Sequence, residues 1–472
     1  MRKLISVFIL FFSFFLSSQE PLFTLIDSEK TGINFSNDLV DTKDHSIFLY
    51  ANYYGGAGVG IGDFDNDGLE DIFLAANLID DKIYKNLGDF QFEDKTKLSG
   101  IINNGSWSTG VTVADVNNDG LLDIYVSCEL YDDAPFLRTN KLYINKGDFK
   151  FVESAKKWGV DVDRRTRHSV FFDYDNDGLL DLYLLNHPPN TGNFSPFFGS
   201  DMTLPEYNLQ LFENKGDHFV DVTEKAGLNR AGFPNAAVIG DFNKDGWADI
   251  YVANDFDAPD FLYFNNKDGS FSYKTESSLR HTSFYSMGVD AADINNDSYL
   301  DLMVLDMTAE DNFRLKSNMS GMNPDSFWNV VNGGGHYQYM FNTLQLNNGN
   351  DTFSDIAQFT GTAATDWSWA SLVADFDNDG NKDIYITNGL LRDIRNTDAD
   401  KKISEIVSKK INEYIIKNPN DNDISLWDVV NLKELLDILP SQKLKNYYYK
   451  NHGNLQFSKI TDYKGLNQTS FY

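Results

Sequence analysis

The sequence predicts an all-β fold, a β-propeller of four-stranded blades with small helical insertions on one face. The first observation is a nine-residue acidic motif, Asp-x-Asp/Asn-x-Asp-Gly-x-x-Asp, which recurs six times. The second is a β-branched and aromatic run after the motifs, and the third is a recurring Asn-x-Gly turn. Four-stranded units repeated along a chain are what a propeller arranges around its axis. The motifs begin at Asp63, Asp115, Asp173, Asp241, Asp293 and Asp375.

The innermost strand of each blade is expected directly before its acidic motif. Residues 56–62 read Gly-Ala-Gly-Val-Gly-Ile-Gly and supply the small side chains that a crowded propeller axis requires. Glycines also build phosphate-binding loops, but this segment lacks the Gly-Lys-Ser/Thr signature and is followed by a strand. We therefore assign it to an inner strand.

The second strand follows the motif. Residues 71–74 read Asp-Ile-Phe-Leu and residues 123–126 read Asp-Ile-Tyr-Val, which are typical strand sequences. An EF-hand would need a bidentate glutamate at motif position 12 and a helix on either side. Position 12 is instead Leu74 in the first copy and Val126 in the second, so the EF-hand interpretation is excluded.

The third and fourth strands flank an Asn-x-Gly-Asp turn. Residues 84–90 and 143–149 place this turn between aromatic residues, which indicates a hairpin. A closing segment such as residues 219–228 follows. The unit is therefore strand, metal loop, strand, long connection, strand, turn, strand. We expect the repeats near residues 56–101, 107–160, 167–228, 233–279, 284–361 and 367–466, all within one propeller over 19–472.

The closing segment occurs seven times, once at residues 23–27 before any metal loop. In a ring closed by mixing its termini, that segment would complete a seventh blade. Residues 469–472 repeat the sequence of residues 282–285, which leads into the fifth metal-loop strand. Two interpretations stay open: a seven-bladed ring in a fragment that lacks most of its last blade and anything downstream, or a six-bladed ring with an extra strand.

The acidic motif has the donor set of a calcium site. Oxygen side chains at positions 1, 3, 5 and 9, with the backbone carbonyl of position 7, form a nearly complete shell for a hard cation. The expected cofactor is Ca²⁺, about five or six ions per chain. The predicted carbonyl ligands belong to Leu69, Leu121, Leu179, Trp247, Tyr299 and Asn381. The predicted side-chain ligands are Asp63, Asp65, Asp67 and Asp71; Asp115, Asn117, Asp119 and Asp123; Asp173, Asp175, Asp177 and Asp181; Asp241, Asn243, Asp245 and Asp249; Asp293, Asn295, Asp297 and Asp301; and Asp375, Asp377, Asp379 and Asp383.

The six loops are not equivalent. Loops one, three and six carry four acidic side chains and are expected to bind most tightly, whereas the other three carry three. The fifth loop is expected to be the weakest, because Ser298 must adopt a conformation that glycine accepts more easily. Ordinary Asp-Gly turns without metal are the alternative for any single copy.

The N-terminus and the composition indicate an exported protein. Residues 1–18 begin Met-Arg-Lys, continue through an apolar run to Leu16 and end in Ser-Ser, which predicts a cleaved signal peptide. No second stretch of membrane-spanning length follows. Loss of Arg2 and Lys3 changes the formal charge from −30 to −32, which argues against nucleic acid and anionic membrane as partners. Cys128 is the only cysteine, so an intrachain disulfide is excluded.

The Phe-Asp-x-Asp-Gly loops and the strand spacing resemble the FG-GAP or VCBS repeats of integrin-alpha-type propellers over about residues 23–466. Residues 342–349 and 365–370 more narrowly resemble the secreted bacterial propellers related to cartilage acidic protein, in which an ASPIC/UnbV domain often follows. This sequence contains no such domain. The resemblance implies calcium-bearing hairpin loops with a structural role, and it implies no particular ligand.

Long insertions are expected at the end of the propeller opposite the metal loops. They span residues 186–208, 306–340 and 388–446, and helical spacing predicts a helical cap over 399–446, with a second helix from Ser425 to Pro440. This face is where binding or catalysis is expected. Its candidates are His187, Trp328, His336, Tyr337, Trp367, Trp369, Arg392, Asp393 and Arg395. Core packing is the stronger interpretation for Trp367 and Trp369, and a solvated ion pair with Arg392 or Arg395 is the ordinary one for Asp393.

The sequence therefore predicts a secreted, calcium-stabilised propeller that recognises an extracellular glycan or protein at the cell surface. The alternatives are an extracellular polysaccharide-active enzyme with an axial pocket, and the structural part of a larger protein. No catalytic constellation is readable in the sequence. A carboxylate pair or a His-Tyr-Arg group that converges on the axis opposite the metal loops would favour the enzyme, whereas a flat cap would favour adhesion.

Overall fold

Six four-stranded antiparallel sheets form the blades of a propeller, each in simple chain order from its innermost to its outermost strand. The structure is a computed structural model that describes residues 23–50, 52–188, 205–256, 258–318, 323–419, 425–460, 465–466 and 469–470. The predicted signal peptide at 1–18 lies outside the described residues. The all-β propeller predicted from the sequence is confirmed, with six complete blades among these residues.

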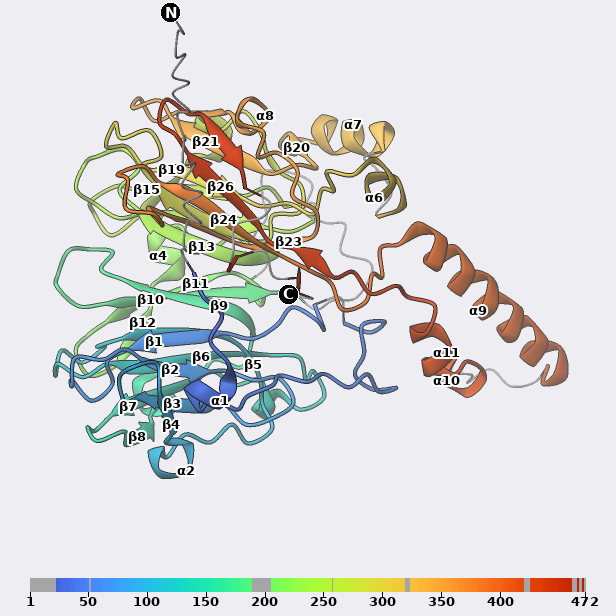
Figure 1. Ribbon diagram of the computed structural model, residues 1–472, viewed down its shortest axis with the longest axis horizontal. Helices are drawn as coiled ribbons and strands as arrows, with labels where there is room; N and C mark the ends of the chain where they lie inside the picture. The colour runs from blue at the N-terminus through green and yellow to red at the C-terminus, as the bar shows by residue number, and fades with distance from the viewer. Residues whose placement is uncertain are drawn as a thin grey trace, which may run out of the picture.

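The first three blades follow one another in the N-terminal half of the chain (Figure 1). Blade one contains β1 (Val59–Gly62), β2 (Asp71–Leu74), β3 (Lys82–Asn86) and β4 (Phe92–Asp94). Blade two contains β5 (Trp107–Ala114), β6 (Asp123–Glu129), β7 (Lys141–Asn145) and β8 (Phe151–Glu153). Blade three contains β9 (Arg165–Phe172), β10 (Asp181–His187), β11 (Gln210–Asn214) and β12 (Phe219–Asp221).

The last three blades repeat this order with longer connections. Blade four contains β13 (Pro234–Gly240), β14 (Asp249–Asn254), β15 (Phe261–Asn265) and β16 (Phe271–Tyr273). Blade five contains β18 (Val289–Ala292), β19 (Asp301–Val304), β21 (Thr343–Asn347) and β22 (Phe353–Asp355). Blade six contains β23 (Ser368–Ala374), β24 (Asp383–Asn388), β26 (Tyr447–Asn451) and β27 (Phe457–Lys459). Two short ladders pair β17 (Thr282–Ser283) with β20 (Gln338–Tyr339) and β25 (Leu444–Lys445) with β28 (Thr469–Ser470).

Short helical turns close the blades and dock on the next one. They are α1 (Ser28–Thr31), α2 (Thr96–Ser99), α3 (Ala155–Trp158), α4 (Thr223–Ala226), α5 (Thr275–Ser278) and α8 (Ala357–Thr360); a 3-10 turn, η1, spans Pro135–Leu137. A Cβ on Gly100, after α2, would lie 2.6 Å from the Phe151 carbonyl of blade two, and one on Gly32, after α1, would lie 2.7 Å from the Phe92 carbonyl of blade one. The segment before blade one therefore docks as a closing segment, although residues 23–27 form no strand, in contrast to the sequence-based expectation.

Neighbouring blades are held together in two ways. The inner strands lie side by side in the order β1, β5, β9, β13, β18, β23. In addition, the side chain of Asn145, at the end of β7, donates to the Phe64 carbonyl of blade one at 2.9 Å and to the Leu122 carbonyl of its own blade at 3.0 Å. The same cross-blade bond recurs at Asn214, Asn265, Asn347 and Asn451.

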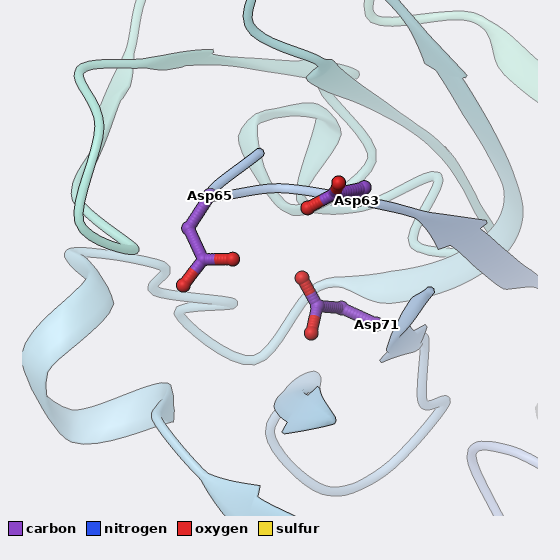
Figure 2. A group of neighbouring side chains, drawn as sticks. All are labelled: Asp63, Asp65 and Asp71. Atoms are coloured by element: carbon purple, nitrogen blue, oxygen red, sulfur yellow. The ribbon is translucent and has the colours of Figure 1, made fainter. Parts of the chain in front are cut away.

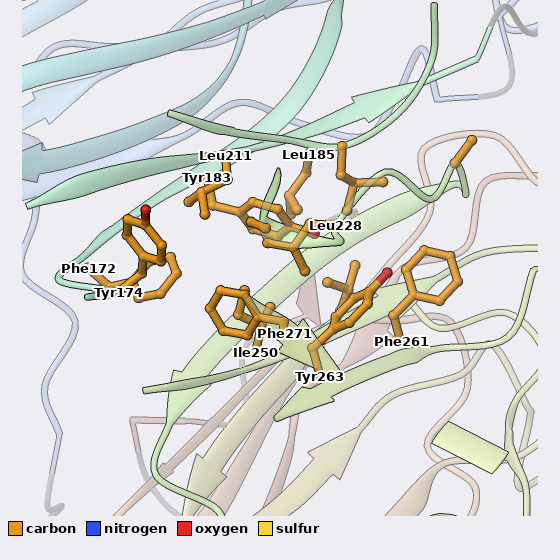
Figure 3. Packing of buried hydrophobic residues seen from close by; sticks show 14 of the residues in the cluster. Phe172, Tyr174, Tyr183, Leu185, Leu211, Leu228, Ile250, Phe261, Tyr263 and Phe271 are labelled. Atoms are coloured by element: carbon orange, nitrogen blue, oxygen red, sulfur yellow. The ribbon is translucent and has the colours of Figure 1, made fainter. Parts of the chain in front are cut away.

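Apolar and aromatic side chains fill the space between blades. Between blades three and four, Tyr183 and Leu185 from β10 pack with Ile250, Tyr263 and Phe271 (Figure 3). All but Phe271 have no exposed surface, and Phe271 is 6% exposed. Burial of one such side chain stabilises the fold by about 1.5–3 kcal/mol, so the interfaces between blades form the core.

The helical insertions gather on one side of the ring (Figure 1). They are α6 (Asn312–Ser317), α7 (Pro324–Asn332), α9 (Thr397–Lys417), α10 (Leu426–Val429) and α11 (Leu432–Leu436). The single second helix expected over Ser425–Pro440 is wrong: it is interrupted at Val430 and Asn431, where Asn431 caps a new helix through the amide of Glu434. Within the described part of the chain, no helix is both long and apolar enough to cross a membrane.

The insertions meet the N-terminal segment over the axis. Tyr50, Tyr53 and Tyr54 from this segment are buried with Trp107 of β5 and with Leu436 of α11. Residues far apart in the sequence thus form one apolar cap above blades one and two.

Candidate functional site

The metal loops fold around their first aspartate. In loop one, Oδ1 of Asp63 accepts from the amide of Asp67 at 3.0 Å and Oδ2 accepts from the amide of Gly68 at 2.7 Å. Gly68 has φ of 87°, in the left-handed region that glycine adopts without strain. These bonds turn the chain back so that the acidic side chains of the loop face one another.

Three of the six loops bring three carboxylates together. Asp63, Asp65 and Asp71 have oxygens within 4.8 Å of one another, and their carboxylates point toward a common centre (Figure 2). The same arrangement recurs in loops three and six, at Asp173, Asp175 and Asp181 and at Asp375, Asp377 and Asp383. In the other loops position 3 is an asparagine, at Asn117, Asn243 and Asn295, which removes one carboxylate from each group.

The donor set fits a calcium ion. Oδ1 of Asp65 and Oδ1 of Asp377 are buried, and neither accepts a hydrogen bond. Buried carboxylate oxygens without a partner are costly, and a hard cation in an all-oxygen shell would satisfy them. The residues whose carbonyls are predicted ligands, Asn381 among them, occupy position 7 of their loops. Calcium binding by the predicted ligands stays a prediction.

The ninth aspartate of each loop also has a role that the sequence did not reveal. Asp71 has no exposed surface, and its two oxygens accept from the amides of Phe64 at 2.9 Å and Asn86 at 2.7 Å. It thereby ties the loop to the third strand. Burial raises the pKa of Asp71 to about 6, and that of Asp123, Asp181, Asp249 and Asp301 to about 7.

Lysines from the third strand, or from the turn that follows it, reach three of the loops. Lys85 of β3 donates to Asp65 and Asp67, and Lys450 of β26 donates to Asp377 and Asp379. In loop four, Lys267 lies 3.3 Å from Asp245. Each ammonium group supplies a positive charge within a loop that is predicted to hold a cation.

At the opposite end of the ring, β-bulges alter the inner strands. In blades two, three and four, one extra residue on the inner strand interrupts the pairing with the second strand: Thr109, Arg167 and Asn235. Bulges re-aim side chains and are frequent next to functional sites. The facing ends of the second strands carry Glu129, His187 and Asp255, which occupy equivalent positions six residues after the ninth aspartate of their loops.

These residues form a buried group that we call the axial cluster: Tyr50, Glu129, Arg167 and His187. Nη1 of Arg167 lies 3.7 Å from Oε2 of Glu129, and Nδ1 of His187 lies 3.9 Å from Oε1. Glu129 has no exposed surface, and neither of its carboxylate oxygens accepts a hydrogen bond. Burial lowers the pKa of His187 to about 4, and burial followed by the charge of Glu129 raises the pKa of Tyr50 well above its usual value.

Two cavities adjoin the axial cluster. One, of about 270 Å³, includes Tyr50 in its lining, and the other, of about 480 Å³, includes His187. Both are lined by Arg165 and Asp132, whose side chains form an ion pair. The insertion face is therefore not a flat cap.

The other sequence candidates have mixed outcomes. Trp367 is buried with Met287 and Leu390, and the indole N–H of Trp369 donates to the Gly389 carbonyl at 2.7 Å, so both pack as expected. Asp393 is not a solvated partner of Arg392 or Arg395: its side chain is fully buried and pairs with Arg314 of α6 at 3.1 Å. That correction arises because α6, distant in sequence, folds over blade six.

Exposed aromatic residues also lie on the insertion face. Trp328 of α7 is 51% exposed and Tyr337 is 41% exposed, whereas His336 is half-buried. Sequence reasoning missed Tyr50, Glu129 and Arg167. A usable signal was present, because Arg167 occupies an inner strand position where other blades carry alanine, threonine, asparagine, methionine or tryptophan.

Comparison with known proteins places these features in a family context. The model of the FG-GAP-like repeat matches residues 63–126, 199–252, 241–304 and 323–386. Each match ends three residues after a ninth-position aspartate, inside a second strand. The matches therefore include loops one, two, four, five and six with the strands that follow them, whereas loop three lies between the matched segments.

Two curated relatives are similar over part of the chain. Cartilage acidic protein 1 of Xenopus tropicalis is 28% identical over 164 residues, which is 34% of this chain and 24% of that protein. Cartilage acidic protein 1 of Homo sapiens is 24% identical over 238 residues, which is 49% of this chain and 33% of that protein. The matched part of the chain thus spans about a quarter to a third of the length of these relatives.

Among solved structures, the chain is similar to a lectin of Agrocybe aegerita that was solved for its specific recognition of non-reducing terminal N-acetylglucosamine. The TM-score is 0.43 with 16% sequence identity, and the match covers 87% of this chain and 83% of that chain.

Proposed function

Because this chain belongs to the FG-GAP-like repeat family, we propose that it is a secreted, calcium-binding β-propeller that recognises a glycan or protein at the cell surface. The observation that carries the recognition role is the cavity-bearing insertion face, which lies opposite the metal loops and gathers the helical insertions, exposed aromatic residues and the axial cluster. Binding residues are commonly presented on such loops by a rigid scaffold.

Calcium has a structural role in this proposal. The unpartnered oxygens of Asp65 and Asp377 support ion binding in loops one and six, and the hydrogen bonds of Asp71 to Phe64 and Asn86 would transmit that bracing to the third strand. When bound, the ion would supply positive charge at the centre of each acidic loop. It would thereby hold the blades that present the insertion face.

Export is supported by the sequence of residues 1–18, whose charged start, apolar run and serine end suit a signal peptide. The relatives cover this chain only in part, so their own activities are not transferred to it. An extracellular location also provides the millimolar calcium that low-affinity loops require.

A binding experiment tests the recognition role. The mature chain would be applied to arrays of glycans and of extracellular-matrix proteins, in calcium and in chelator. We expect calcium-dependent retention, weakened by Trp328→Ala on the insertion face and unaffected by Phe359→Ala, which removes a 75% exposed ring on α8. Absence of retention by a folded, calcium-loaded chain would contradict the proposal.

The axial cluster favours a second candidate function, an extracellular polysaccharide-active enzyme. Tyr50, Arg167 and His187 converge with Glu129 opposite the metal loops, which is the grouping expected of an axial catalytic pocket. Glu129 could move a proton at a glycosidic oxygen, and Arg167 could bind an adjacent hydroxyl. Release of new reducing ends from a polysaccharide panel, abolished in Glu129→Gln, would support this function over pure recognition.

A further inference from the structure

We propose that Glu129, Arg167 and His187 form a binding site for the vicinal hydroxyl groups of a neutral sugar. This inference rests on the proposed recognition function and names where a glycan would be held. The site lies at the ends of β6 and β10 and at the bulge of β9, on the face opposite the metal loops.

The first reason is an unmet demand for hydrogen-bond donors. Neither buried oxygen of Glu129 has a hydrogen bond, and the one neutral donor beside it, the Tyr50 hydroxyl, can serve one oxygen at most. The nearest cation, Nη1 of Arg167, is 3.7 Å away and is too distant for a direct hydrogen bond. A ligand that donates two hydroxyl protons to one carboxylate would satisfy both oxygens.

The second reason is the tautomer of His187. Its Nε2 lies 2.9 Å from the Pro234 carbonyl, which can only accept, so Nε2 carries the proton and Nδ1 is a bare acceptor. That bare Nδ1 faces Oε1 of Glu129 at 3.9 Å. Two acceptors that face each other across this distance require donors from a third group.

The third reason is the balance of charge, which selects a neutral ligand. The negative charge of Glu129 is matched by Arg167, and that of Asp132 is matched by Arg165. Glu129 is the only carboxylate of the cluster and cannot supply the all-oxygen shell of a divalent cation, and its charge would repel an anion. A sugar hydroxyl both donates and accepts, so it can bond to Glu129 and receive a hydrogen bond from the guanidinium.

The fourth reason is that the backbone is built to place these groups. The bulge on β9 adds Arg167 as the unpaired residue, and its Nη2 also donates to the Gly55 carbonyl at 3.2 Å. A Cβ at Gly55 would lie 2.3 Å from that nitrogen. Glycine at this position therefore leaves room for the guanidinium, which reaches from blade three to the segment that enters blade one.

Two cavities lie beside the cluster: Tyr50 lines one and His187 lines the other, whereas Glu129 and Arg167 line neither and lie behind these two side chains. The cavity of about 480 Å³ is lined by His187 and is large enough for a sugar ring. The smaller cavity is lined by Tyr50, and the ion pair of Arg165 with Asp132 borders both. Asp132 is exposed on 58% of its side-chain surface, so this border lies toward solvent.

The test is titration of the calcium-loaded mature chain with methyl α-mannoside and methyl β-galactoside, followed by saturation-transfer NMR and calorimetry. We expect one of these glycosides to bind, and Glu129→Gln to weaken binding by about tenfold or more, because one charge-assisted acceptor is lost. Glu224→Gln, at an exposed position on α4, is the matched control and should bind as the unchanged chain does.

Folding is checked separately. Thermal unfolding identifies a Glu129→Gln chain that fails to fold, and Tyr50→Phe then serves as the second variant, since it removes only a hydroxyl beside Glu129. Weakened glycoside binding in that folded variant would support the site. Equal binding by the Glu129→Gln and unchanged chains would overturn it.

The same experiments separate this inference from the proposed function. Retention on a glycan array that Glu129→Gln leaves intact would overturn the axial site while recognition stands. Loss of both glycoside binding and array retention in Glu129→Gln would support the axial site and the recognition function. Absence of glycoside binding and of any array retention would overturn both.

Discussion

The ammonium nitrogen of Lys85 lies 2.7 Å from Oδ2 of Asp67, so a side chain of the third strand reaches into the first metal loop. The same lysine also donates to Asp65. When a calcium ion binds in this loop, the Lys85 ammonium group must move away or share the carboxylates with the ion. Loop six has the same device in Lys450.

We therefore expect Lys85→Met and Lys450→Met to strengthen calcium binding. Each substitution removes a competing positive charge and should improve affinity several-fold, on the order of 1 kcal/mol for one partly exposed ion pair. Calorimetric calcium titration measures the effect. Lys82→Met is the matched control, because Lys82 lies in the same strand but pairs with Asp94 outside the loop. Unchanged affinity in both loop variants would show that the lysines do not compete.

Removal of calcium is expected to destabilise the propeller. Elemental analysis of the mature chain should find about five or six calcium ions, and chelator should lower the melting temperature, because the acidic side chains of each loop would then repel one another. Asp65→Asn with Asp377→Asn should weaken calcium binding in loops one and six toward that of loops two and four, which carry asparagine at the same position. Little bound calcium and an unchanged melt would mean that the loops are only turns.

Ser298 is expected to be a strained position. Its φ is 71°, in the left-handed region, where the equivalent residue of loop one is Gly68. Ser298→Gly should stabilise the chain by about 1 kcal/mol, measured by denaturant unfolding, because glycine adopts this conformation without strain. The reverse change in loop two, Gly120→Ser, has open space for a side chain and should cost a similar amount. A neutral result at both sites would contradict this account.

The asparagine side chains that donate hydrogen bonds from one blade to the next should contribute to the stability of the fold. Asn145→Ala removes the donor to the carbonyls of Phe64 and Leu122 and leaves both acceptors buried, so we expect a loss of about 2–3 kcal/mol in the free energy of unfolding. Asn86→Ala is the comparison, because the Asn86 side chain donates to Glu70 within blade one. Equal losses would indicate that the cross-blade bond adds nothing.

His187 should make stability fall in acid. Its folded pKa is about 4, below the unfolded value of about 6.5, so the unfolded chain binds more protons between these values. Stability is fully present above about pH 6.5 and is lost as the pH falls toward 4, by about 3 kcal/mol at most. Glu129, Arg165 and Arg167 are the charged groups that act on this ring.

The check is denaturant unfolding of the unchanged chain and His187→Asn at pH 7 and pH 4.5. The variant should lack this part of the acid loss, and His452→Asn, at an exposed position, should retain it. The difference between chains isolates His187 from buried carboxylates such as Asp255, whose pKa burial raises to about 7. Equal pH dependence in all three chains would refute the prediction.

Much of the fold follows from local chemistry in the sequence. The acidic motifs, the strand runs after them and the Asn-x-Gly turns fix short-range geometry, because a turn and its flanking strands lie within about a dozen residues. Blade order, the inner strand at residues 56–62 and the helix around Ile403 were accessible in this way. The burial of Asp393 was not, since it depends on an ion pair with Arg314 from a distant segment, whereas the break at Val430 follows from a local cap at Asn431 that the sequence interpretation overlooked.

By itself, the sequence determined a repeating four-stranded propeller with acidic loops at one end and insertions at the other, because periodic local signals need no long-range contact. Only the tertiary structure decided which side chains meet at the axis. Tyr50, Glu129, Arg167 and His187 come from four separated segments, and the packing of blades two and three with the segment before blade one, together with a β-bulge, brings them together. Such proximity depends on register and on the packing of neighbouring blades, which no single repeat encodes.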